Sequence, residues 1–217
     1  MPAQRQSPDR KTVLFGKTIC RLVAVAPWAW PLIASSVGRF FDRAADGWDE
    51  RTDAGSAEHL ATLASGLDAL GLKPERVLDL GCGTGAGTLF LSREFPQASI
   101  RGVDLSDSMI EKARAKIGLD PEGRVSFRTG DASKLPFGDD SFDLVTQVNM
   151  PVFFRQITRV LRPGGGLILA SSLGDRTPFS TPEKLVRRRL GSLGFDPIHS
   201  GSAGDGTWIA ARLKETR

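Results

Sequence analysis

Residues 77–87 combine a buried-strand pattern with a run of glycines, and this combination could bind a nucleotide-like ligand. The segment reads VLDLGCGTGAG, in which an apolar run containing Asp79 leads into glycine at every second position from 81 to 87. The apolar residues that follow predict a helix, so the turn would bring backbone N–H groups and a helix N-terminus against the ligand. The pattern G-x-G-x-x-A at Gly81, Gly83 and Ala86 also fits a dinucleotide site. A carboxylate at Asp79, however, would repel a pyrophosphate and would suit a ligand that carries an ammonium group.

The sequence of residues 77–85 resembles the first motif of the class I, Rossmann-like S-adenosylmethionine (SAM)-dependent methyltransferases. That motif has the form h-h-D-h-G-x-G-x-G, where h is an apolar residue, and VLDLGCGTG matches it throughout. The resemblance implies that SAM is the cofactor and that Asp79 lies near its α-amino group. It also implies that the methionine part of SAM lies against a glycine loop that includes Gly81, Cys82, Gly83 and Gly85.

A second acidic residue follows the glycine loop. Residues 100–106 read IRGVDLS, which predicts a strand that ends at Asp104, roughly twenty residues beyond the loop, where an acid can bind a ribose. Ionised aspartate only accepts hydrogen bonds, so Asp104 suits a diol that offers two donors. Leu105 and Met109 would then line the adenine side, although Met109 fits a place in the core equally well.

A third segment, GDASKLPF at residues 130–137, follows another expected strand. Class I methyltransferases commonly carry a similar G-D-A-x-x-L-P-F element. The resemblance places the Asp131 carboxylate on the adenine amino group and the Ala132 N–H on a ring nitrogen, whereas a nicotinamide-dependent dehydrogenase has no need of this element. Gln147, near the end of the expected strand at 141–148, completes the set of expected cofactor-binding residues.

The order of the expected elements predicts an α/β fold: a seven-stranded, mostly parallel sheet with an antiparallel last strand and helices on both faces, as in Rossmann-like methyltransferases. Helices are expected at 56–70, from a Ser106 cap to Gly118, before Pro163, and from a Thr181 cap to Gly194. The last two strands are expected at 195–199 and 207–213, joined by a hairpin loop at 200–206. A two-half dinucleotide fold would need another crossover helix, for which too little chain follows.

Length and composition agree with one domain plus an N-terminal appendage. The chain has 217 residues, 40% of them hydrophobic, and a net charge of +4. We expect an N-terminal arm or lid at residues 1–54 and a SAM-binding methyltransferase domain at residues 55–217. Two cysteines give no disulfide framework, which together with SAM indicates a cytoplasmic protein. We expect no metal. We also expect no nucleic-acid partner, because the one basic run, at 187–189, lies on a helix that also needs a solvated face.

The N-terminal region allows several interpretations. Residues 1–12 are polar and are expected to be frayed. Residues 22–37 are apolar, but prolines interrupt them and the stretch is too short for a transmembrane span. A signal peptide is set aside because export would separate the enzyme from SAM. The remaining interpretations are a lid packed over the active site, a membrane-surface contact and a dimer contact.

Residues 40–49, FFDRAADGWD, resemble an F-D-x-x-A-x-x-Y-D element that precedes the catalytic domain in methyltransferases similar to the ubiquinone and menaquinone C-methyltransferases. Trp48 stands where that pattern has tyrosine. Its indole N–H donates a hydrogen bond but cannot accept one, so a phenolic base is lost here. Trp48 is a candidate acceptor-binding residue, whereas His59, near the start of the expected helix at 56–70, is expected to be structural.

Asn149 is the second candidate for contact with the acceptor, because it follows the central strand and strand ends at that place face the ligand crevice. It could equally cap a helix that begins at Pro151. No catalytic base is evident, and none is required, because positioning alone contributes about 7–11 kcal/mol in well-oriented reactions. The sequence thus predicts SAM-dependent methyl transfer, by in-line displacement, to a small or lipid-like acceptor at oxygen, nitrogen or carbon. The alternatives are a non-catalytic SAM-binding regulatory or scaffold module and a nicotinamide-dependent oxidoreductase.

Overall fold

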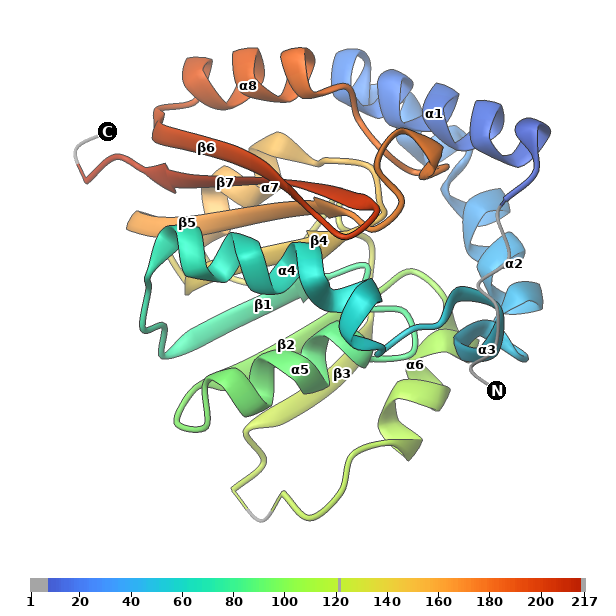
Figure 1. The fold of residues 1–217 in the computed structure, drawn as a ribbon, viewed down its shortest axis with the longest axis horizontal. Helices are drawn as coiled ribbons and strands as arrows, with labels where there is room; N and C mark the ends of the chain where they lie inside the picture. The colour runs from blue at the N-terminus through green and yellow to red at the C-terminus, as the bar shows by residue number, and fades with distance from the viewer. Residues whose placement is uncertain (1–7, 121, 216–217) are drawn as a thin grey trace.

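A seven-stranded β-sheet forms the centre of the computed structural model, which describes residues 8–120 and 122–215 (Figure 1). The strands are β1 (Arg76–Leu80), β2 (Ser99–Asp104), β3 (Val125–Thr129), β4 (Phe142–Val148), β5 (Leu161–Ser171), β6 (Phe195–Ala203) and β7 (Gly206–Leu213). Their order in the sheet is β3-β2-β1-β4-β5-β7-β6. Strands β1 to β5 pair in parallel, and β7 is antiparallel to both of its neighbours. The expected mostly parallel, seven-stranded sheet is confirmed.

The strand order reverses between β1 and β4, which lie side by side at the centre of the sheet. Chains that leave these two strands turn to opposite sides, so a crevice opens at their carboxyl ends. The glycine loop follows β1, and Gln147 lies near the end of β4. The topology therefore brings the segments singled out by the sequence to one edge of the sheet.

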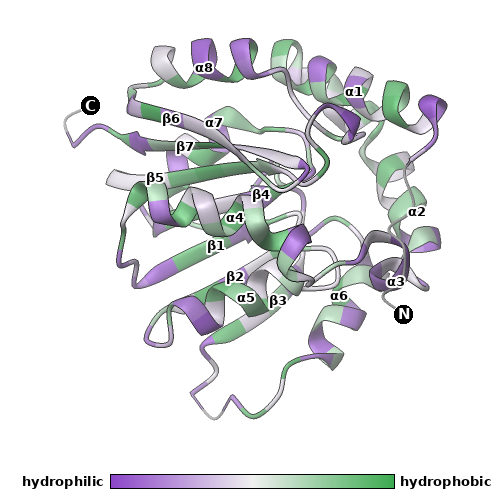
Figure 2. Ribbon diagram, in the orientation of Figure 1, coloured by the Kyte–Doolittle hydropathy of each residue, from purple (hydrophilic) through white to green (hydrophobic). Residues whose placement is uncertain are grey.

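Helices cover both faces of the sheet (Figure 1). They are α1 (Arg10–Val25), α2 (Ala34–Ala44), α3 (Trp48–Thr52), α4 (Ala57–Leu70), α5 (Ala86–Glu94), α6 (Asp107–Ala115), α7 (Phe154–Val160) and α8 (Glu183–Ser192), with 3₁₀ segments η1 (Pro27–Leu32) and η2 (Gly174–Arg176). Leucines of α4 and α5 form one apolar cluster with the sheet. Residues of α1, α7 and α8 join a second cluster on the other face. Figure 2 shows hydrophobic residues along much of β5 and at the end of β1 in the centre of the sheet.

The helix caps follow from local chemistry. Ser56 accepts a hydrogen bond from the N–H of His59 at the start of α4, and Gly71 ends that helix in the left-handed conformation. Ser106 caps α6 as expected, accepting from the N–H of Met109. At the N-terminus, the Asp9 carboxylate accepts from Lys11 and Thr12 and starts α1 at Arg10. Residues 10–12 are therefore helical, not frayed, while residues 1–7 lie outside the described part of the chain.

Three expected element boundaries are wrong. Helix α6 ends at Ala115, one turn before Gly118. Helix α7 begins at Phe154, not at Pro151. Helix α8 begins at Glu183, and the Thr181 side chain makes no cap to it.

The expected hairpin loop at 200–206 is also wrong, because β6 continues to Ala203 and leaves only residues 204–205 as the turn. Glycine and serine in this stretch are typical of a loop, but in the folded protein another side chain occupies the space that a side chain on Gly201 would fill. A Cβ on Gly201 would lie 2.6 Å from Cζ2 of Trp208, its partner across the strand pair. The indole therefore packs over the glycine and keeps the two strands paired.

No helix within residues 8–120 and 122–215 is long and apolar enough to cross a bilayer.

The packing predicts that Gly102→Ala destabilises the fold. A Cβ at this position in β2 would lie 2.5 Å from the buried Phe127 ring and 3.0 Å from Thr88 Oγ1. We expect the free energy of unfolding to fall by about 1–3 kcal/mol, as for other overpacked cores. The matched control is Gly191→Ala in α8, where an added Cβ meets nothing within 4 Å. Chemical denaturation should show the control unchanged or slightly stabilised, and equal losses in both variants would contradict this account.

Candidate functional site

The glycine loop between β1 and α5 has a backbone conformation that depends on glycine. Gly81, Gly83 and Gly85 have φ values of 63°, 53° and 87°, which L side chains rarely adopt. The N–H of Gly81 donates to the carbonyl of Val103 at 2.8 Å, which holds the loop against β2. A Cβ on Gly83 would meet nothing within 4 Å, so this part of the backbone borders open space. The loop is thus firmly held on one side and accessible at Gly83.

Asp104 lies directly against this loop. Its Oδ2 accepts a hydrogen bond from the N–H of Gly83 at 2.9 Å, and its Oδ1 accepts from the N–H of Ser106 at 2.9 Å. Withdrawal from water raises the pKa of this carboxyl group, although the backbone hydrogen bonds counteract the shift. An ionised carboxylate keeps further lone pairs after two such contacts. Its position suits the predicted role in binding a ribose diol.

Asp79 lies beneath the loop and is only 2% exposed. Thr88 Oγ1 donates to its Oδ2 at 2.7 Å, and Thr146 Oγ1 donates to its Oδ1 at 3.0 Å. Burial raises the pKa of Asp79 to about 6, while the two threonine hydrogen bonds oppose that rise. Burial, with the charges of Asp104 and Asp79, also raises the pKa of the neighbouring Cys82 thiol. Asp79 and Cys82 therefore belong to the buried side of the loop, and a contact of Asp79 with an ammonium group stays a prediction.

Asp131 is held by the N-terminal part of the chain. The indole Nε1–H of Trp30 donates to both carboxylate oxygens, at 2.9 and 3.0 Å, and the N–H of Ser133 donates to Oδ1 at 2.7 Å. Trp30 is 3% exposed, and its ring packs edge-to-face on Phe153 with centroids 5.1 Å apart. Ala132, beside Asp131, is buried as well. An adenine amino group at this position would have to share the Asp131 carboxylate with Trp30 or displace it.

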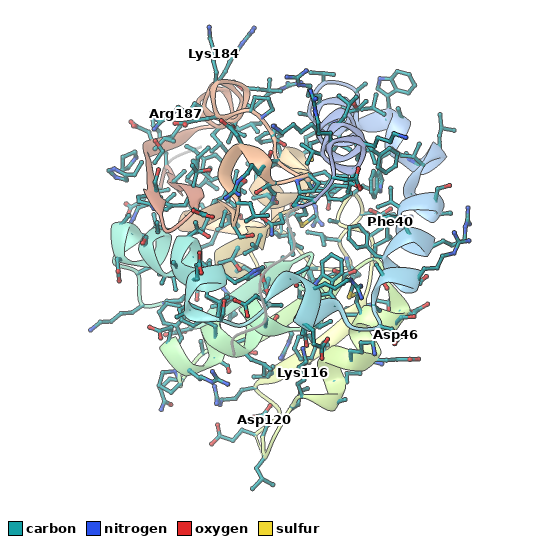
Figure 3. All side chains as sticks on the ribbon, turned by 45° about the vertical axis from the view of Figure 1, so that its right-hand side comes forward. Phe40, Asp46, Lys116, Asp120, Lys184 and Arg187 are labelled. Atoms are coloured by element: carbon teal, nitrogen blue, oxygen red, sulfur yellow. The ribbon has the colours of Figure 1, made fainter. Side chains whose placement is uncertain are left out.

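Two aspartates of the segment FFDRAADGWD fasten α2 and α3 onto the same edge of the sheet. Ser106 Oγ donates to Asp42 at 2.6 Å, and Thr84 of the glycine loop donates its hydroxyl to Asp49. Asp49 also forms an ion pair with Lys116 of α6, and nearby Asp46 pairs with Lys112 at 2.9 Å. Figure 3 shows Asp46 and Lys116 at the end of the molecule where α2, α3 and α6 meet. The sequence pattern contained both Asp42 and Asp49, but only the fold shows what they bind.

The other expected cofactor residues differ in accessibility. Leu105 is partly buried next to Gly38 of α2, whose added Cβ would lie 3.6 Å from its Cγ. Met109 is 1% exposed and packs in the core. Gln147 is 3% exposed, and its Nε2 donates to the carbonyl of Met150 at 3.2 Å.

Asn149 connects the ends of β4 and β5. Its Nδ2 donates to Ser172 Oγ at 2.8 Å, and its Oδ1 accepts from the N–H of Ser172 at 2.9 Å. It has a φ of 55°, a conformation that asparagine tolerates better than most residues. The expectation that it caps the next helix is wrong, because α7 begins five residues later without a side-chain cap. Contact of Asn149 with an acceptor stays a prediction.

A cavity of about 420 Å³ lies beside the carboxyl ends of β4 and β5. Its apolar wall includes Val152, Leu169, Phe179, Val186 and Ile209. Charged groups of both signs also line it: Lys17 and Arg21 of α1, and Asp175 and Glu183. Gln147 lines it as well, and its buried Oε1 accepts no hydrogen bond from any described residue. This atom is available to a donor on a ligand.

Met150 connects the cavity to the glycine loop. It lines the cavity, and its Sδ would lie 2.5 Å from a Cβ placed on Gly81. Trp48 does not line the cavity directly, but its ring packs on Phe41, which in turn packs on Phe179 of the cavity wall. Sequence reasoning missed Lys17, Arg21 and Phe179, because they come from α1 and from the segment after β5, where no motif marks them.

The strand order with its antiparallel β7, together with the glycine loop and its strand-end acids, defines the Rossmann-like fold of class I methyltransferases. Residues 77–165 match the family described as "Methyltransferase domain".

Two curated relatives show the extent of the similarity. The chain is 37% identical over 131 residues to the O-methyltransferase cnsE of Penicillium expansum, covering 57% of this chain and 46% of that protein. It is 34% identical over 152 residues to the malonyl-[acyl-carrier protein] O-methyltransferase of Legionella pneumophila subsp. pneumophila, covering 67% of this chain and 52% of that protein. The chain thus spans about half the length of these relatives.

The fold also occurs in a protein described by a different activity. The crystal structure of the [4+2]-cyclase SpnF aligns with a TM-score of 0.64 at 19% identity, covering 82% of this chain and 95% of that one. At this identity the likeness concerns the fold alone.

The contact between Trp30 and Asp131 predicts a stability difference between two tryptophan variants. Trp30→Phe keeps an aromatic ring but removes the N–H that both Asp131 oxygens accept. We expect the free energy of unfolding to fall by about 1.5–3 kcal/mol, the usual range for a hydrogen bond to a charged group. Trp28→Phe is the control, because that side chain is 77% exposed. Thermal unfolding that ranks the two variants equally would contradict an anchoring role for Trp30.

The buried Asp79 predicts a pH dependence of stability. Its pKa is about 6 in the folded protein against an ordinary value of 3.8, so the unfolded chain releases this proton at lower pH than the folded chain. Between these two values the folded state binds more protons, and the contribution of Asp79 to stability therefore falls as the pH rises. Asp79→Asn cannot titrate and should lose this decline. Denaturation midpoints measured across that pH range should fall less in the variant, and identical slopes would refute the assignment.

Proposed function

We propose that this protein transfers a methyl group from SAM to a small-molecule or lipid-like acceptor. The observation that carries the proposal is the continuity of the glycine loop with the cavity beside β4 and β5, because Met150 contacts both. A loop of this kind suits a nucleoside cofactor. The cavity next to it combines an apolar wall with polar and charged side chains that could orient a ligand, as small-molecule sites do.

The residues around the loop fit SAM. Gly83 leaves its backbone open to a ligand, and Asp104 beside it offers acceptor lone pairs for a ribose diol. Asp79 adds negative charge on the buried side of the loop, which favours a cationic ligand nearby. Bound SAM would supply an activated methyl group on its sulfonium.

The chain's own contribution to transfer would then be binding, orientation and exclusion of water. The apolar wall of the cavity would desolvate the acceptor, and Gln147 Oε1 would accept a hydrogen bond from its hydroxyl or amino group. Such orientation contributes about 7–11 kcal/mol in favourable cases without any catalytic base. We further propose that residues up to 54 act as a lid over this edge of the sheet, supported by the contacts of Trp30, Asp42 and Asp49. We also propose that the protein acts in the cytoplasm, where SAM is available.

A non-catalytic SAM-binding module is the second candidate. The same fold occurs in a [4+2]-cyclase, so the fold by itself does not establish methyl transfer. The nicotinamide-dependent oxidoreductase has less support, because β7 lies between β5 and β6 and is antiparallel to both.

Cofactor binding tests the site. Asp104→Asn removes the charge that faces the loop, and we expect its affinity for SAM to fall by about 10- to 100-fold, as for loss of a hydrogen bond to a charged group. The control is Asp107→Asn, an exposed carboxylate three residues further on, which should bind SAM like the unaltered protein. Isothermal titration calorimetry measures both. Unchanged affinity in Asp104→Asn would remove the ribose assignment.

Turnover distinguishes the two candidates. Thermal shifts with SAM, its demethylated product, NAD and NADP should show stabilisation by the first two only. Release of the demethylated product should then occur with an acceptor from a panel of hydroxylated, amino and carboxylic lipids. SAM binding without release for any acceptor would favour the non-catalytic module, and stabilisation by NAD or NADP alone would contradict both.

A further inference from the structure

We propose that the outer face of α1 and η1 docks on an anionic lipid surface. In the described part of the chain, seven large hydrophobic residues are prominently exposed, and six of them lie between residues 14 and 40. They are Leu14 (70%), Phe15 (53%), Val25 (60%), Trp28 (77%), Leu32 (81%) and Phe40 (42%), and the exception is Leu119. Soluble proteins seldom gather exposed apolar side chains in one segment unless it binds something.

Helix α1 has apolar residues on both of its sides. Gly16, Ile19, Cys20, Val23 and Ala24 are buried against the second apolar cluster. Leu14, Phe15 and Val25 are spaced so that they share the opposite side, and they are exposed. Figure 2 accordingly shows hydrophobic and hydrophilic colours alternating along α1. A helix that only covered a core would carry polar residues on its outer side.

The exposed apolar residues continue past the end of α1 into η1, with Trp28 and Leu32. We call Lys11, Leu14, Phe15, Arg21, Val25, Trp28 and Leu32 the outer face. Phe40 is not part of it, because Figure 3 shows Phe40 on the side of α2 that faces the body of the protein.

The positive charge of residues 10–41 indicates that the partner of the outer face is anionic. Residues 10–41 contain five basic residues and no acidic one, while the remainder of the chain holds 24 basic and 25 acidic residues. The segment therefore carries a charge of +5 and the remainder of the chain −1, so all of the net positive charge comes from this segment. Within the described residues, none of the five basic side chains lies within 4.0 Å of a carboxylate oxygen. Lys17 donates to the carbonyl oxygen of Asp175 at 2.6 Å, and the charge of Lys11 helps to lower the pKa of nearby Asp9, but the segment as a whole keeps a net positive charge that can attract an external anion.

Anionic lipid fits both properties. Apolar side chains enter the boundary between headgroups and acyl chains, tryptophan favours that boundary, and basic residues are attracted by the negative surface. A second copy of the chain fits less well, because a two-fold contact through this face would bring like charges together.

Docking in this way would place lipid next to the acceptor cavity. Lys17 and Arg21 line that cavity, and both belong to α1. A lipid-like acceptor could then reach the cavity from the surface on which α1 lies. This last step depends on the proposed function, whereas the docking itself does not.

Vesicle co-sedimentation tests the docking with the full chain and without SAM, so its outcome is independent of the methyltransferase assignment. We expect binding to vesicles of phosphatidylcholine mixed with phosphatidylglycerol, little binding to phosphatidylcholine alone, and weakening by added salt. The double variant Trp28→Ser and Leu32→Ser should bind at least about tenfold more weakly, because two anchors no longer enter the lipid. Leu119→Ser, which removes an exposed apolar side chain elsewhere, should bind normally.

A charge-reversal pair separates electrostatic attraction from the apolar contribution. Lys11→Glu should weaken binding by about fivefold or more, given the usual contribution of one basic residue near an anionic surface. Lys184→Glu, on α8 and pointing away from the body of the protein in Figure 3, should leave binding unchanged. Circular dichroism confirms that each variant is folded.

The proposal would be overturned if no vesicles bound, or if the paired variants behaved alike. It would also be overturned if sedimentation velocity without lipid showed a dimer that the double variant at Trp28 and Leu32 dissolves, since the outer face would then be an interface between copies.

Discussion

The hydrogen bond from the N–H of Gly83 to the Asp104 carboxylate is the contact on which the site depends. Gly83 follows β1 and Asp104 ends β2, so the bond joins two adjacent strand ends and fixes the loop between them. It requires the left-handed conformation of Gly83, and it keeps a carboxylate at the open side of the loop. The loop backbone is thereby held in one conformation, so a ligand that bound there would not have to supply the free energy of ordering it.

The same edge of the sheet also carries the N-terminal segment. Thr84 is in the loop and Ser106 follows Asp104, and each donates to an aspartate of the N-terminal helices. In the opposite direction, the indole N–H of Trp30 in η1 donates to the Asp131 carboxylate. Residues that a sequence motif would assign to the cofactor and residues that hold the N-terminal segment are thus neighbours. A ligand bound at these residues would therefore lie next to the N-terminal segment.

The sequence predicted the parts of the structure whose causes are local. The strand, glycine loop and helix at 76–94 and the Ser106 cap depend on neighbouring residues, and each was found. The loop assigned to 200–206 failed because β6 pairs with β7 as far as Ala203 and Trp208 packs on Gly201, which are contacts between two strands. Of the two roles expected for Asn149, the helix cap failed for a similar reason, since its partner Ser172 lies 23 positions away on the neighbouring strand end.

By itself, the sequence determined the fold class, the order of the strands along the chain and the place of the glycine loop, because hydrophobic periodicity, glycine and proline act within a few residues. Only the tertiary structure decided that Asp131 accepts a hydrogen bond from Trp30 and that Asp79 is buried between two threonines. It also decided that Lys17 and Phe179 line the same cavity as Gln147. It also showed that one side of α1 is covered and the other is exposed. These features depend on which distant segments meet across the sheet, and the spacing of residues along a chain does not encode that directly.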